Sequence, residues 1–151
     1  MLVSLFACQN QKFDLIIENA VIYDGSGAQS TIGDVGINSD TIAAVGDLSK
    51  AEASRIVDAN GLALSPGFID THSHLAGSTE KFPEALAALN QGVTTIVSGQ
   101  DGYGSWVDSI RVQFQKKPVA INIATYTGQT ALRELAMGGE GQLERPATQA
   151  E

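Results

Sequence analysis

The stretch PGFIDTHSH, residues 66–74, decides the fold of this chain of 151 residues. A proline and a glycine open it, and Phe68 and Ile69 then begin a short apolar run that passes into polar residues. A run of this kind after turn residues predicts a β-strand. His72 and His74 are the only two histidines of the chain. Because residues i and i+2 of a strand point to the same face, we expect the two imidazoles to project side by side.

A strand–helix–strand–helix–strand pattern begins at this stretch. The expected elements are a strand at 68–74, a helix at 83–91, a strand at 93–98, a helix that begins at the Ser105–Asp108 capping box, a strand at 119–127 and a short helix at 131–137. Helices that alternate with apolar strands connect them by right-handed crossovers, which give a parallel sheet. The fold class expected for residues 67–151 is therefore α/β.

The region before the stretch, residues 13–66, reads as short strands separated by turns. The dipeptide Asn60-Gly61 accepts the positive φ angles of a tight hairpin turn. We therefore expect a small antiparallel β module of about 50 residues, which would be only marginally stable alone.

Residues 1–12 differ from both of these regions. Residues 1–7 are apolar, and the segment Leu5-Phe6-Ala7-Cys8 resembles the lipobox of a bacterial lipoprotein, with Cys8 as the lipidated residue. A frayed N-terminus with a buried thiol is the alternative, because the basic region and long apolar core of a signal peptide are not in this sequence. The first interpretation predicts a lipid anchor at the periplasmic side of the cell envelope, and the second a cytoplasmic protein.

Charge and composition restrict the partners. Nine basic residues against seventeen acidic ones give a formal charge of −8, which argues against a nucleic-acid partner. With one cysteine, the chain cannot form an intrachain disulfide or a cysteine-rich zinc module.

The two histidines indicate a metal site. They lie where the first parallel strand ends, and α/β proteins place their sites at the carboxyl ends of such strands. Two neutral imidazoles on one face suit a divalent ion such as zinc. Asp70 shares their face and is a candidate to accept the second ring N–H of a ligating histidine. The alternative is that His72, His74 and Asp70 are unrelated polar residues of a loop.

Four segments together resemble the amidohydrolase superfamily, and specifically its N-acyl-D-amino-acid deacylase (D-aminoacylase) branch. They are FDLIIENA at 13–20, PGFIDTHSH at 66–74, QGVTTIVSGQDG at 91–102 and GQTALR at 128–133. The resemblance implies a partial TIM-type (β/α)8 barrel, represented by its first three strands, after a small antiparallel β-sandwich module. It also implies metal-dependent hydrolysis of the amide bond of N-acyl-D-amino acids, with one or two divalent ions, zinc above all.

The resemblance also implies a set of site residues. His72 and His74 match the metal ligands of the family, and Asp101 occupies a ligand position where the family usually has cysteine. A carboxylate oxygen binds zinc at about the same distance as an imidazole nitrogen. No catalytic base matches within the chain, and a complete barrel needs about 250 residues. We therefore expect the base beyond residue 151, and an inactive N-terminal part here.

Two alternatives remain at this point. The first is another amidohydrolase that shares the paired histidines, such as a dihydroorotase-, hydantoinase- or dipeptidase-like enzyme. The second is a non-catalytic βαβ binding module.

Overall fold

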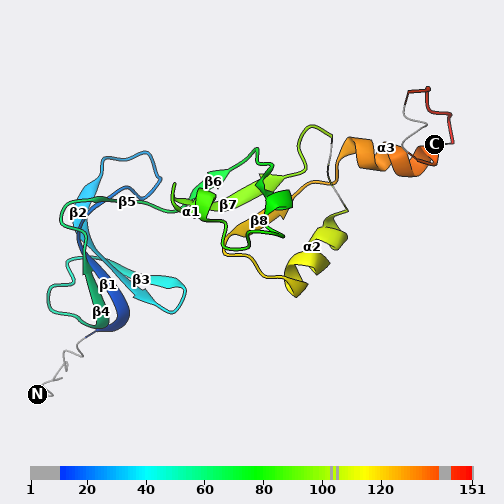
Figure 1. Cartoon of the computed structure of the whole chain (residues 1–151). Coiled ribbons are helices and arrows are strands. Elements are labelled where there is room, and N and C mark those ends of the chain that lie inside the picture. Colours follow the sequence, from blue (N-terminus) through cyan, green and yellow to red (C-terminus); the bar gives the residue numbers. More distant parts are fainter. Residues whose placement is uncertain (1–10, 103, 105, 140–143, 151) are drawn as a thin grey trace, which may run out of the picture. The chain divides into compact units, whose positions relative to one another are not determined.

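The computed structural model of the protein describes residues 11–102, 104, 106–139 and 144–150. The chain divides into two compact units, of which the first ends at Pro66 and the second begins at Gly67 (Figure 1). Among the described residues, no helix has both the length and the apolar character needed to cross a membrane.

The first unit contains a mixed five-stranded sheet. Its strands are β1 (Lys12–Ile22), β2 (Thr31–Asn38), β3 (Thr41–Gly46), β4 (Glu52–Asp58) and β5 (Ala63–Leu64). The order is β3-β2-β1-β4, and β5 also pairs with β1. β1 and β3 are antiparallel to β2, whereas β4 and β5 both run parallel to β1.

This arrangement corrects the expected antiparallel β-sandwich, because the described residues of this unit form one sheet with both parallel and antiparallel pairs. Asn60 and Gly61 do adopt positive φ angles of 49° and 78°, and the Leu62 N–H closes the turn on the Ala59 carbonyl at 2.8 Å. However, the turn does not join two paired strands. The Gly61 N–H donates to the carbonyl of Asn19 in β1, so the turn moves the chain from one half of the β1 edge to the other.

A small apolar cluster stabilises one region of this sheet. Phe13, Ile16 and Leu48 are all nearly inaccessible to solvent. The ring of Phe13 lies so close to Gly36 that a Cβ there would approach it to 2.7 Å. Burial of these side chains stabilises the unit through removal of apolar surface from water.

The second unit contains three parallel strands in the order β6-β7-β8, as the alternation of strands and helices predicts. The strands are β6 (Phe68–Asp70), β7 (Val93–Ser98) and β8 (Asn122–Thr125), and the helices are η1 (Leu75–Ser78), α1 (Leu86–Leu89), α2 (Val107–Lys116) and α3 (Gln129–Met137). η1 is a single 3-10 turn.

The core of the second unit surrounds the central strand. Ile96 of β7 is fully buried and packs with Ala85, Ala88 and Ile121. β7 lies between β6 and β8 and is a run of β-branched and small residues, as in strands that are covered on both faces. This core fixes the strands whose carboxyl ends carry the candidate site.

Two helices differ from the sequence expectation. Helix α1 begins at Leu86 rather than at Pro83, because Ala85 is left-handed with a φ of 48° and a left-handed residue interrupts a right-handed helix. Helix α2 begins at Val107 with Trp106 as its N-cap residue. The expected capping residue Ser105 lies outside the described residues.

Candidate metal site

The carboxyl ends of two neighbouring parallel strands carry the candidate site. β6 ends at Asp70, and β7 ends at Ser98. Because the two strands are parallel and adjacent, both ends reach the same edge of the sheet. His72 and His74 follow β6, and Asp101 follows β7.

The two histidines lie after the strand rather than on it, which corrects the expectation that the strand continues to residue 74. His72 lies in a bend, and His74 is the residue before η1. The bend is fixed by two backbone donors, since the His72 N–H bonds to the Asp70 carboxylate at 3.1 Å and the Ser73 N–H to the Val97 carbonyl at 3.0 Å. The two rings are nevertheless neighbours, with centroids 5.6 Å apart.

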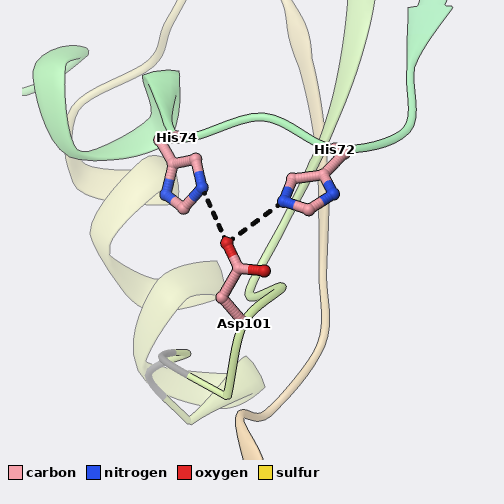
Figure 2. A group of neighbouring side chains, drawn as sticks. All are labelled: His72, His74 and Asp101. Carbon is pink, nitrogen blue, oxygen red and sulfur yellow. Dashed lines mark hydrogen bonds and ion pairs between the residues drawn. The ribbon is translucent and has the colours of Figure 1, made fainter.

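Both imidazoles face one oxygen of Asp101 (Figure 2). The Nε2 atoms of His72 and His74 each lie 3.1 Å from its Oδ2. Asp101 has a φ of 61°, in the left-handed region that aspartate enters more readily than most residues. Gly99 and Gly102 on either side have φ angles of 90° and 82°. A tight left-handed turn thus directs the carboxylate at the histidine pair.

The electrostatics of the site favour an ionised carboxylate. The hydrogen bond from His72 is the largest influence and lowers the pKa of Asp101 below its ordinary value. Desolvation opposes this effect, while the charge of His72 and the contact with His74 add to it. An ionised Asp101 can offer an oxygen lone pair to a cation.

The three side chains fit a divalent metal ion. One donor atom from each of His72, His74 and Asp101 lies within 4.8 Å of the other two. Donors bound tetrahedrally at about 2.0–2.1 Å from one ion lie about 3.3 Å apart, slightly farther than the two distances of 3.1 Å. Two imidazole nitrogens and one carboxylate oxygen are a donor set for zinc and similar ions, and three protein ligands leave further coordination positions open.

The other two sequence candidates stand apart from this set. The Asp70 carboxylate accepts the backbone N–H of His72, and no hydrogen bond from an imidazole ring to Asp70 is present among the described residues. Asp70 therefore shapes the bend that presents His72. Cys8 lies outside the described residues.

A side chain that the sequence analysis did not single out also reaches this region. The Gln100 side-chain amide donates to the Thr71 carbonyl at 2.7 Å, next to both Asp101 and His72. Its position directly before Asp101 is the one sequence signal that points to it.

A pocket of about 350 Å³ adjoins the site at His74. Polar side chains line part of this pocket. Among them are Ser98 of β7 and Thr125 of β8, which are hydrogen-bonded to each other at 3.2 Å. Helix α2 closes one side with Ile110 and Phe114. The arrangement thus places a cavity of small-molecule size beside one imidazole.

The parallel strands make this unit an α/β protein, and the two imidazoles and the carboxylate at one sheet edge give it a candidate metal site. No protein-family model matches the chain. Among known proteins, N-acyl-D-aspartate deacylase of Alcaligenes xylosoxydans xylosoxydans is 33% identical over 91% of this chain, and D-aminoacylase of the same organism is 31% identical over 94%. The aligned regions are 32% and 34% of these two proteins, so the chain spans about a third of their length.

Solved structures give the same result. A D-aminoacylase with a binuclear metal centre matches with a TM-score of 0.81 at 31% identity, over 91% of this chain and 33% of that chain. The N-acyl-D-glutamate deacylase of Bordetella bronchiseptica, complexed with zinc and a phosphonate inhibitor, matches with a TM-score of 0.77 at 29% identity, over 84% and 32%. L-hydantoinase from Arthrobacter aurescens matches with a TM-score of 0.56 at 25% identity, over 76% and 27%.

Over most of its length, the chain is therefore a homologue of D-aminoacylase and the N-acyl-D-aspartate and N-acyl-D-glutamate deacylases, which are metal-dependent amidohydrolases. The family resemblance that the sequence motifs predict is confirmed.

Proposed function

We propose that the protein containing this chain hydrolyses the amide bond of N-acyl-D-amino acids with the help of a divalent metal ion, zinc in the first instance. One observation carries the proposal: the Nε2 atoms of His72 and His74 both lie 3.1 Å from one Asp101 oxygen, at the ends of adjacent parallel strands. The deacylase relatives support the reaction and the substrate class.

The residues of this chain have defined tasks in that reaction. His72 and His74 offer Nε2 lone pairs, and Asp101 offers a carboxylate oxygen. A bound divalent ion makes water more acidic and polarises the carbonyl of the scissile amide. The pocket beside His74 provides room for part of a small substrate. The proton acceptor that hydrolysis requires is not identified among the described residues.

The test is an assay of the full-length protein against N-acetyl-D-aspartate, N-acetyl-D-glutamate and N-acetyl-D-methionine, with release of the free D-amino acid as the readout. We expect turnover that a chelator abolishes and zinc restores, and a loss of at least about 100-fold in the His72→Ala and His74→Ala variants. Turnover that survives both substitutions would contradict the proposal.

Hydrolysis of a cyclic amide is the second candidate, because the hydantoinase neighbour shares the fold of 76% of the chain. The deacylase neighbours match more of the chain at higher identity, which favours the first candidate. Hydantoins in the same assay distinguish the two reactions. Preference for a hydantoin over every N-acyl-D-amino acid would favour the second.

The architecture of the whole protein is a further part of the proposal. We infer that residues 67–151 are the first part of an amidohydrolase barrel, and that residues 13–66 belong to a separate β domain. The three parallel strands β6, β7 and β8 support the first inference, and the division at Pro66 supports the second.

We also propose a lipid anchor at Cys8, which would place the protein at the cell envelope. The sequence Leu5-Phe6-Ala7-Cys8 supports it. When the full-length protein is produced in a bacterium, it should partition with the membrane fraction and a Cys8→Ser variant should not. Equal partitioning of the two proteins would exclude the anchor.

A further inference from the structure

The loop that carries Asp101 is attached to the rest of the unit on two sides. On the side of β8, the Thr130 N–H bonds to the Gly102 carbonyl at 2.9 Å and the Gly128 N–H to the Gly104 carbonyl at 3.2 Å. Both bonds join backbone to backbone, and the two segments approach so closely that a Cβ at Gly128 would clash with the Gly102 carbonyl.

On the side of β6, the attachment is made by a side chain. The Gln100 Nε2 donates to the Thr71 carbonyl at 2.7 Å, and Thr71 directly precedes His72. The bridge thus joins residues 100 and 71, while the candidate metal site joins residues 101 and 72. Among the described residues, this is the one hydrogen bond between the 71–74 segment and the 99–102 segment that does not involve Asp101 itself.

The carbonyl oxygen of the Gln100 side chain lacks a hydrogen-bond partner in the described part of the chain, which indicates that the contact of the amide nitrogen with Thr71 is maintained at some cost. The Gln100 Oε1 atom is buried and has no hydrogen-bond partner among the described residues. A buried polar atom without a partner is unfavourable and uncommon in proteins. An apolar residue of similar length would avoid this cost, but it would also remove the bond to Thr71. The conformation therefore keeps the donor contact despite the unpaired acceptor.

We propose that Gln100 is a positioning residue of the metal site, a proposal that rests on the function proposed above. Its amide holds the Asp101 loop against the His72 bend, so that the carboxylate and both imidazoles are already in place before an ion binds. Outer residues that orient ligands commonly contribute about 10–100-fold to metal affinity. Gln100 acts on the ligands through the backbone and does not contact the ion.

The experiment is a titration of the 151-residue chain with Co²⁺, followed through its visible absorption, in Gln100→Met and in a matched control. Methionine keeps the length of the side chain and removes the donor. The control is Gln91→Met, because the Gln91 Nε2 also donates to a backbone carbonyl, that of Ala87, but in helix α1. We expect about 10–100-fold weaker binding and an altered spectrum for Gln100→Met, and parent behaviour for Gln91→Met.

A Gln100→Glu variant separates positioning from charge. Its added negative charge by itself tightens the binding of a cation, whereas loss of the donor weakens it, so we expect Gln100→Glu to bind Co²⁺ more tightly than Gln100→Met. Co²⁺ affinity within twofold of the unsubstituted chain in Gln100→Met would overturn the role of Gln100 alone. If the unsubstituted chain binds no Co²⁺, the metal site and the role of Gln100 are both overturned. The same holds if the His72→Ala variant binds Co²⁺ as tightly as the unsubstituted chain.

Discussion

Among the residues of the site, Asp101 is the one whose loss is easiest to interpret. It lies 3.1 Å from both imidazoles, and its side chain is about half exposed, so its replacement leaves the core intact. We predict that Asp101→Ala weakens zinc binding by at least about 100-fold, measured by competition with a chromophoric chelator. The control is Asp108→Ala, which removes an exposed aspartate that pairs with Arg111. Equal loss in both variants would show a general effect of charge rather than a ligand.

The hydrogen bonds of Asp58 lead us to expect that the stability of the first unit depends on pH. The Asn19 side-chain amide and then the Asn60 N–H donate to its carboxylate, and they lower its pKa below the ordinary value of 3.8. A depressed folded-state pKa stabilises the fold above the unfolded-state pKa, and this stability is lost as pH falls through the folded-state pKa.

We therefore predict that Asp58→Asn lowers the free energy of unfolding at neutral pH, and that its difference from the parent shrinks below about pH 4. Urea unfolding at several pH values measures this difference. A carboxyl titration followed by NMR gives the pKa of Asp58 directly. A pKa at or above 3.8 would refute the explanation.

Among the elements, strand β7 holds the second unit together. Ile96 at its centre has no exposed surface. Ile96→Ala should lower the free energy of unfolding by about 2–5 kcal/mol, because it leaves a cavity in the core. Val112→Ala on helix α2, where the side chain is 43% exposed, should change it by less than about 0.5 kcal/mol. Comparable effects of the two substitutions in chemical denaturation would place the core elsewhere.

The segment between β8 and α3 packs directly on the Asp101 loop. A Cβ at Gly128 would clash with the Gly102 carbonyl and the Gly104 nitrogen, whereas a Cβ at Gly77 would meet no atom within 4 Å. Gly128→Ala should therefore destabilise the unit by about 1–3 kcal/mol and weaken metal binding. Gly77→Ala should change stability by less than about 1 kcal/mol. Thermal unfolding combined with the zinc competition assay checks both effects, and unchanged metal binding in Gly128→Ala would show that the loop is fixed without this contact.

The local elements are predicted from sequence where a segment carries its own pattern. The β-branched run at 93–98 predicts β7 with its observed bounds, and the short helix expected at 131–137 makes up most of α3. Such local patterns do not determine which distant segments pair in a sheet. The parallel contact of β1 with β4 is therefore missed, and the turn at Asn60-Gly61 is interpreted as a hairpin.

In the candidate site too, local patterns are predictable from the sequence, whereas contacts between distant segments are not. Two histidines at positions i and i+2 predict neighbouring rings, and the rings are neighbours in the structure. However, the two residues lie in the loop after β6 and not on a strand. The approach of Asp101 depends on a left-handed turn about thirty residues later, and only the family resemblance points to it. The Gln100 bridge depends on a contact between two loops, for which the sequence offers position alone.

At the scale of the whole molecule, the chain spans about a third of the length of its deacylase relatives. Among its described residues, one group of three or more histidine, cysteine or acidic side chains is close enough to hold an ion. We predict that residues 1–151 alone bind a divalent ion but release no D-amino acid from N-acetyl-D-glutamate, because no proton acceptor is identified beside the site. Zinc-dependent turnover by the purified chain, absent in His74→Ala, would show that the chain contains the complete machinery.

The proposed function requires one ion shared by His72, His74 and Asp101. Anomalous diffraction at the zinc absorption edge, from crystals of the chain grown with zinc, measures this directly. We expect a peak within about 2.0–2.2 Å of the Nε2 atoms of both histidines and of a carboxylate oxygen of Asp101. A peak bound by other residues, or well-ordered rings that keep their contact with Asp101 in saturating zinc without any peak between them, would contradict it.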